Sequence, residues 1–228
     1  MLDDYFKTKI PEFNIHNTLL VARPGIIFIL IAFVPLLIFW LLDLTILRNI
    51  FFIIFLFVIW FFRDPFRVVP PEGFAVSPAD GKIIRIEKKA VCPITGEVST
   101  KISIFMNIFS VHVNRVPLSG TVKAIHYYKG TLVNASFDKA SLNNERNVFH
   151  FKDNHGRDFV LVQIAGLIAR RIVCWVKKDE PVERGQRFGM IRFGSRVDIY
   201  LPPDAIVMVS LGQNVIAGTS PIWRFPET

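Results

Sequence analysis

The feature that most constrains this chain is a long apolar stretch from Gly25 to Phe62, in which only Asp43 and Arg48 carry charge. Its first part, Gly25 to Leu42, is about 18 residues long. As a helix it would measure ~27 Å, close to the ~30 Å of a bilayer's hydrocarbon core. The second part, Ile46 to Phe62, is similar in length. We therefore expect residues 25–62 to form a membrane helical hairpin with a short turn at its charged break.

The basic residues that flank this hairpin predict its orientation. The chain outside the apolar stretch supplies several of them, whereas the turn has Arg48 alone: the flanking set is Lys7, Lys9, Arg23, Arg63 and Arg67. The positive-inside rule then places both chain ends, and the region that follows, on the cytoplasmic side of the cell (inner) membrane. A signal peptide fits poorly, because the stretch starts late and runs too long. A hairpin lying in one leaflet remains an alternative.

The net charge of +8 lies almost entirely beyond residue 70, because the first 70 residues hold six Lys or Arg and five Asp or Glu. A basic surface beside a hydrophobic anchor suits an anionic bilayer. Nucleic acid is the other usual partner of a basic protein, but we find no nucleic-acid motif and no clustered basic run. The membrane is therefore the expected partner, and nucleic acid is not.

The two cysteines, Cys92 and Cys174, lie far apart and have no C-x-x-C or metal-ligand spacing. Neither a disulfide framework nor a zinc site is indicated, and we expect no metal.

Beyond the hairpin, short apolar runs alternate with Gly, Pro, Asn and Asp, a pattern typical of strands. We expect a short cytoplasmic segment over residues 1–24 and one mainly β domain over 63–228, compact and barrel-sandwich-like. The predicted strands are Gly81–Ile86, Lys101–Met106, Thr121–Tyr127, Val148–Phe151, Phe159–Ile164, Ala169–Val176, Phe188–Ile191, Val197–Leu201 and Ile206–Val209.

Three residues of this domain could together activate a hydroxyl group: Asp80, His112 and Ser195. A histidine accepts the proton of a serine, and an aspartate fixes the tautomer of the histidine. Each residue also has an ordinary interpretation, because Asp-Gly and Gly-Ser are common turn dipeptides and a lone histidine is more often a packed side chain. An ordinary hydrolase is disfavoured, because Ser195 lacks the G-x-S-x-G nucleophile elbow.

Four segments, in order, match a known family. They are Phe61-Phe-Arg-Asp-Pro-Phe-Arg67, Ser77-Pro-Ala-Asp-Gly-Lys82, His112-Val-Asn-Arg-Val-Pro117 and Arg192-Phe-Gly-Ser-Arg-Val-Asp198. Over nearly its whole length the chain resembles the short bacterial and archaeal form of the phosphatidylserine decarboxylase proenzyme. The last segment is the most specific, because it resembles the self-processing site of that family.

The resemblance implies that Ser195 attacks the carbonyl of Gly194, helped by His112 and Asp80. The resulting ester eliminates, and hydrolysis of the dehydroalanine leaves a pyruvoyl group. Residues 1–194 would then be the β chain and residues 195–228 the α chain of a heterodimer. No external cofactor would be needed, because the pyruvoyl group forms a Schiff base with the phospholipid substrate and takes up the electrons left when CO2 departs.

Some roles within the family pattern stay open. His112 is the nearest candidate acid for protonating the carbanion. The longer bacterial form carries two histidines in this motif, and Arg115 stands where the second aligns. Arg115 and Arg196 could contact the lipid phosphate, since guanidinium groups pair well with phosphate oxygens, or could be paired with carboxylates.

Two alternative functions are weighed against this one. The substrate could be another serine-headed lipid, such as an archaetidylserine-like ether lipid. A different class is a lipoyl or biotinyl carrier module, suggested by Pro78-Ala-Asp-Gly81 and Gly185-Gln-Arg-Phe-Gly189, but Lys82 lacks the setting of a modified lysine. Homo-oligomers through exposed strand edges are possible.

Overall fold

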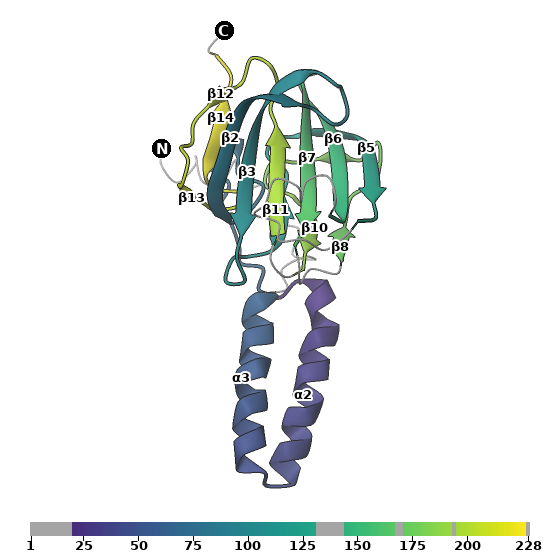
Figure 1. Ribbon diagram of the computed structural model, residues 1–228, viewed down its shortest axis with the longest axis vertical. Coiled ribbons are helices and arrows are strands. Elements are labelled where there is room, and N and C mark those ends of the chain that lie inside the picture. The colour runs from purple at the N-terminus through teal and green to yellow at the C-terminus, as the bar shows by residue number, and fades with distance from the viewer. Residues whose placement is uncertain (1–19, 131–143, 167–170, 193–194, 227–228) are drawn as a thin grey trace, which may run out of the picture.

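A pair of apolar helices projects from a β domain in the computed structural model, which describes residues 20–130, 144–166, 171–192 and 195–226 (Figure 1). A 3-10 turn, η2 (Arg23–Gly25), leads into α2 (Ile26–Leu41), and α3 (Thr45–Phe61) returns antiparallel to it. Asp43, with φ of 53°, lies in the turn between them. The expected helical hairpin is therefore confirmed, to within one residue at each end.

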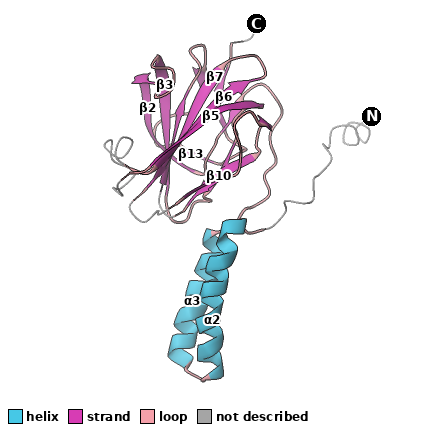
Figure 2. Ribbon diagram, turned by 90° about the vertical axis from the view of Figure 1, so that its right-hand side faces the viewer, coloured by secondary structure: helices cyan, strands magenta, loops and turns pink. Residues whose placement is uncertain are grey.

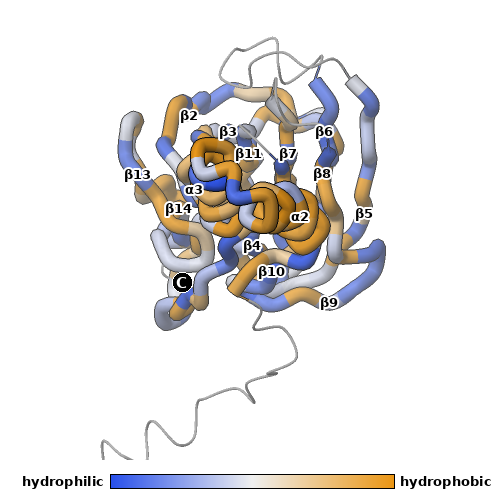
Figure 3. The backbone as a smooth tube through the Cα atoms, turned by 90° about the horizontal axis from the view of Figure 1, so that it is seen from below, coloured by the Kyte–Doolittle hydropathy of each residue, from blue (hydrophilic) through white to orange (hydrophobic). Residues whose placement is uncertain are grey.

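The hairpin presents apolar side chains to its surroundings. Seen from its far end, the hairpin is mostly hydrophobic, with hydrophilic residues near its distal turn (Figure 3). Residues Arg23–Leu41 form a helix with a mean hydropathy of 2.6, which is long and apolar enough to cross a membrane. Helix α3 is apolar but shorter.

The β domain has its strands in three sheets. They are β1 (Ala75–Val76), β2 (Gly81–Val91), β3 (Val98–Met106), β4 (Val113–Arg115), β5 (Gly120–Tyr128), β6 (Arg146–Asp153), β7 (Asp158–Ala165), β8 (Ile172–Cys174), β9 (Pro181–Val182), β10 (Arg187–Ile191), β11 (Ser195–Tyr200), β12 (Ile206–Val207), β13 (Asn214–Val215) and β14 (Pro221–Arg224). The main sheet is antiparallel and ordered β13-β2-β3-β11-β7-β6-β5-β9. Figure 2 shows that it is curled. The smaller sheets are β4-β10-β8 and β1-β14-β12.

The core of the domain fills the curl of the main sheet with aromatic and branched side chains. Phe151 stacks on Phe159 with 5.1 Å between ring centroids, and Phe149 meets Phe188 edge to face at 5.0 Å. These side chains and Trp223 are buried. Buried aromatic pairs contribute about 0.5–1.5 kcal/mol each beyond their area, so they help to hold the curled sheet over its smaller partners.

The expectation of a mainly β, barrel-sandwich-like domain is confirmed, and each of the nine predicted strands overlaps an observed one. The predicted strand Ala169–Val176 begins outside the described residues, and its observed part is β8. The strands that the sequence did not indicate are β1, β4, β9, β13 and β14, each of two to four residues. Runs this short have no detectable alternation.

The root of the hairpin is fastened to the domain by a short ladder. Ala22 N donates to Phe62 O at 2.8 Å, and Asp64 N donates to Leu20 O at 2.8 Å. A Cβ atom on Gly25 would lie 2.4 Å from the Phe62 side chain, so only glycine permits this approach. Phe61 and Phe62 are buried in an apolar cluster with Val111, Val113 and Met190. The two chain ends of the hairpin are thus held together against the β4-β10-β8 sheet.

Candidate active site

Strand register gathers two of the predicted site residues at one end of the main sheet. Lys82 of β2 pairs with Phe105 of β3, so the Asp80-Gly81 turn lies beside the end of β3. Ser195 pairs with Met106 at that same end of β3. Figure 1 shows β3 pointing toward the hairpin. The candidate site therefore lies at the end of the sheet that faces the helices.

Ser195 is the first residue of β11 and is fully buried, with 0% of its surface exposed. Its Oγ atom has no hydrogen-bond partner among the described residues. Leaving a buried polar group unpaired costs about 1–3 kcal/mol, so such a hydroxyl is a candidate for a functional role. Gly194, the predicted site of its attack, lies outside the described residues.

His112 is a buried histidine whose two ring nitrogens are in different environments. Nδ1 lies 2.9 Å from the carbonyl oxygen of Ser110, and since a carbonyl only accepts, Nδ1 donates its proton there. In the neutral ring Nε2 then carries the lone pair, and it is buried with no partner in the described part of the chain. His112 O accepts a hydrogen bond from Ile191 N at 3.3 Å, four residues before Ser195. His112 thus has the tautomer of a general base near the start of β11.

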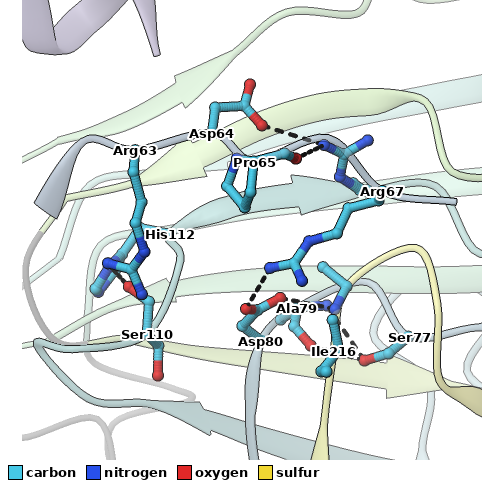
Figure 4. A network of polar contacts seen from close by, with 12 residues as sticks. Arg63, Asp64, Pro65, Arg67, Ser77, Ala79, Asp80, Ser110, His112 and Ile216 are labelled. Atoms are coloured by element: carbon cyan, nitrogen blue, oxygen red, sulfur yellow. Dashed lines mark hydrogen bonds and ion pairs between the residues drawn. The ribbon is translucent and has the colours of Figure 1, made fainter. Parts of the chain in front are cut away.

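The surroundings of His112 keep its ring neutral. The Phe61 ring packs on it with 4.4 Å between centroids. Burial lowers the pKa of His112 to about 4, partly opposed by the hydrogen bond to Ser110 and reinforced by the positive charge of Arg63. Figure 4 shows Arg63 beside His112 and Ser110. At neutral pH the ring can accept a proton.

Asp80 is held by partners other than His112. Its carboxylate accepts hydrogen bonds from Arg67 Nη2 at 2.7 Å and from Ala217 N at 2.8 Å (Figure 4). Burial raises the pKa of Asp80, whereas these two bonds oppose the shift. The structure therefore brings Asp80 to the same end of the sheet without a direct bond to His112. The role of Asp80 in orienting that histidine stays a prediction.

The two candidate phosphate-binding arginines are both buried and paired with carboxylates. Arg115 Nη2 lies 3.1 Å from Asp64 Oδ1, and its Nη1 donates to Gly185 O at 3.0 Å. Arg196 Nε lies 2.8 Å from Asp198 Oδ1. Burial lowers the pKa of Arg115 to about 10, against the effect of Asp64. The carboxylate pairing that the sequence left open is thus present, while contact with a lipid phosphate remains a prediction.

Several residues around the site were not singled out from the sequence. Asp64 binds both Arg115 and Arg187, whose Nε lies 2.5 Å from Asp64 Oδ2. Gln163 Nε2 donates to Asn114 Oδ1 at 2.7 Å, and Gln163 pairs with Val197 of β11. Asp64 belongs to the matched segment Phe61–Arg67, so the motif could have marked it as a candidate site residue. Gln163 stands in an apolar strand, and nothing in its sequence context indicated a partner so distant.

A pocket of about 670 Å³ lies beside Arg115 of β4 and the root of the hairpin. Its lining mixes cations and carboxylates from the hairpin root and the β4-β10-β8 sheet, including Arg23, Asp64, Arg115, Glu183 and Arg187. No group of three or more His, Cys, Asp or Glu side chains that could hold a metal ion occurs in the described residues.

Comparison with known proteins decides the family of the chain. The sequence profile described as phosphatidylserine decarboxylase matches residues 54–222. The chain belongs to the phosphatidylserine decarboxylase family. The matched range contains Asp80, His112 and Ser195.

Relatives named phosphatidylserine decarboxylase proenzyme match most of the chain. The Nitratidesulfovibrio vulgaris protein is 52% identical over 177 residues, covering 75% of this chain and 81% of that protein. The Syntrophus aciditrophicus protein is 50% identical over 171 residues, covering 75% and 80%. The Burkholderia mallei (strain SAVP1) protein is 45% identical over 209 residues, covering 91% and 96%. The resemblance seen in the motifs is thereby confirmed, and membership of the decarboxylase family disfavours the carrier-module alternative.

Proposed function

We propose that this protein converts phosphatidylserine to phosphatidylethanolamine and CO2, using a pyruvoyl group that it makes from its own Ser195. The observation that carries the proposal is the buried Oγ of Ser195, at the sheet end where His112 also has a buried Nε2 atom; among the described residues neither atom has a hydrogen-bond partner. The proenzyme name of the relatives supports a processed product.

Self-cleavage would begin when Ser195 Oγ attacks the carbonyl carbon of Gly194 and its proton passes to a base. The amide bond becomes an ester as the amine is released, and elimination of the Gly194 carboxylate leaves dehydroalanine at position 195. Addition of water and loss of ammonia give the pyruvoyl group. Two chains result, residues 1–194 and 195–228. His112 is the proposed base, because its neutral Nε2 is poised to accept a proton.

The pyruvoyl group would supply an electron sink for decarboxylation, so no external cofactor is needed. Burial at the start of β11 would limit the access of bulk water to the pyruvoyl group once it has formed. His112, once it has taken up a proton, is the proposed acid that returns one to the substrate carbon. The carboxylate of Asp80 and the guanidinium group of Arg67, which are hydrogen-bonded to each other, would provide charged groups at the same end of the sheet.

The hairpin is proposed to cross the membrane with the β domain on the cytoplasmic side. Helices of 16 and 17 residues measure about 24–26 Å. Exposed tryptophans stand near both ends, Trp40 beside the distal turn and Trp60 at the domain end. Tryptophan is enriched at the two interfaces of a bilayer, which favours a spanning hairpin over one lying in a single leaflet.

The experiment is release of labelled CO2 from carboxyl-labelled phosphatidylserine in vesicles, with Ser195→Ala as the control. We expect release by the wild type and loss of at least about a thousandfold in the variant, because a covalent step disappears. A serine-headed ether lipid supplied in the same vesicles tests the alternative substrate. Release from that lipid alone would reassign the substrate, and release by Ser195→Ala would overturn the pyruvoyl proposal.

A further inference from the structure

We propose that the turn Asn107–Ser110 is a second membrane contact, in which Ile108 and Phe109 enter the interfacial region of the bilayer beside the hairpin. The inference deepens the proposed function, because it requires the hairpin to be in a membrane. It assigns a role to the side chains of Ile108 and Phe109, here called the apolar tip, which take no part in the proposed chemistry.

The turn is closed by hydrogen bonds to the Asn107 side chain, and its apolar side chains are exposed. Asn107 Oδ1 accepts hydrogen bonds from Phe109 N at 2.9 Å and from Ser110 N at 3.1 Å. Phe109 is 61% exposed and Ile108 is 38% exposed. Single exposed apolar residues are common on proteins, so exposure alone decides nothing. The position of the tip is what gives it meaning.

That position is the end of the hairpin nearest the domain. Arg63 Nη2 donates to Phe109 O at 2.7 Å, and its Nη1 donates to Trp60 O at 2.8 Å. The guanidinium carbon of Arg63 also lies 4.0 Å from the centre of the Trp60 ring. Phe109 is therefore tied to the last turn of α3. A hairpin that spans the bilayer puts this level at the headgroup interface.

The charges around the hairpin root fit a lipid surface. Arg23 is exposed at the start of the hairpin, and Arg192 stands over the Phe28 ring at 5.3 Å. With Arg63 they place guanidinium groups beside the first turn of α2 and the last turn of α3. Cations at this level are attracted to the negative surface potential of an anionic bilayer. An anionic lipid surface, continuous with the apolar hairpin, is thus the occupant that this tip and its arginines fit.

The same turn reaches the buried base. Ser110, its last residue, accepts the proton of His112 Nδ1 through its carbonyl oxygen (Figure 4). Contact of the apolar tip with lipid would therefore fix the distance between His112 and the bilayer surface. A phospholipid headgroup could then approach while its acyl chains stay in the membrane.

The test places a fluorescent label at chosen positions of the full chain in a Cys174→Ser background, which leaves the buried Cys92. An environment-sensitive nitrobenzoxadiazole label is attached at Phe109→Cys, at Ile53→Cys in the hairpin, and at Asn154→Cys as the control. Asn154 is exposed in the turn between β6 and β7. That turn lies at the opposite end of the sheet, because β7 ends at Ala165, beside Ser195.

In vesicles of phosphatidylcholine and phosphatidylglycerol we expect the label at Phe109 to brighten and to be quenched by lipids spin-labelled near the headgroup. The control at Asn154 should show neither effect. Equal iodide accessibility of the Phe109 and Asn154 labels, with the Ile53 label quenched by the lipid, would overturn the second contact alone. An unquenched label at Ile53 would overturn the membrane hairpin as well, whereas CO2 release tests the chemistry separately.

A kinetic arm uses the unlabelled protein. Phe109→Asp should raise the KM for phosphatidylserine in vesicles by about tenfold or more, because one phenylalanine side chain no longer leaves water. The matched change Asn154→Asp should leave the KM unchanged. A KM for Phe109→Asp equal to that of Asn154→Asp would contradict the proposal.

Discussion

At the scale of single residues, His112 is defined by what surrounds it. Its Nδ1 proton is donated to the carbonyl oxygen of Ser110, its ring packs on Phe61, and its buried Nε2 has no hydrogen-bond partner within the described ranges. The sequence identified the residue through its motif. It could not show that the first partner of the ring is a backbone carbonyl, since that depends on how the turn before β4 folds.

The pH dependence of self-cleavage should reflect this burial. Because burial lowers the pKa of His112 to about 4, the ring stays neutral and able to act as a base well below its ordinary pKa of 6.5. The cleavage rate should hold as the pH falls through 6.5 and drop only near 4. The measurement is the time course of chain separation on denaturing gels. The free energy of unfolding should also decrease as the pH falls from 6.5 toward 4, because in this range the histidine takes up a proton only in the unfolded chain.

Phe61→Leu serves as the matched variant for this profile. It keeps an apolar side chain but loses the ring that covers His112, so hydration should raise the pKa of His112 toward 6.5 and move the acid limb of the profile upward. Phe57→Leu, one helical turn earlier, is the control and should leave the limb in place. An identical limb in Phe61→Leu would show that the Phe61 ring does not set the protonation of the base.

At the scale of elements, the root of the hairpin and the motif segments depend on one another. Gly25 is pressed against Phe62, which stacks on Phe28 and contacts Phe61. The helices were predictable from their apolar length alone. The close approach at their root was not, because a glycine before a helix has many explanations.

Gly25→Ala should therefore destabilise the protein by about 1–3 kcal/mol, since the added methyl would overlap the Phe62 side chain. Thermal unfolding in detergent measures the loss, and Ile26→Ala, at an exposed position on the same helix, is the control. A melting temperature for Gly25→Ala no lower than that of the control would mean that the close contact between Gly25 and Phe62 does not contribute to stability.

Asp64 joins its own motif segment to that of Arg115 through a buried pair, and it also pairs with the half-buried Arg187. Asp64→Asn would leave two guanidinium groups without their carboxylate and should cost about 3–5 kcal/mol in the free energy of unfolding. Glu87→Gln is the control, because Glu87 is 41% exposed in its pair with Lys101 and should contribute at most about 1 kcal/mol. Similar denaturant midpoints for the two variants would argue against this structural role.

At the scale of the whole molecule, the sequence predicted the hairpin, the β domain and the family, because apolar length, strand punctuation and ordered motifs are all local signals. It did not predict the order of the main sheet, which brings β2, β3 and β11 side by side from distant parts of the chain. That order makes neighbours of the Asp80-Gly81 turn, Met106 and Ser195. The carboxylate partners of Arg115 and Arg196 likewise depend on long-range or strand-face geometry.

The central claim is that Ser195 becomes a pyruvoyl group by cleavage after Gly194. The most direct measurement is the intact mass of the purified protein under denaturing conditions, beside that of Ser195→Ala. We expect the wild type to give two fragments, residues 1–194 and a 195–228 fragment with the mass of a pyruvoyl cap that resists Edman degradation, and the variant to give one uncut chain. A single uncut chain in the active wild type would contradict the account.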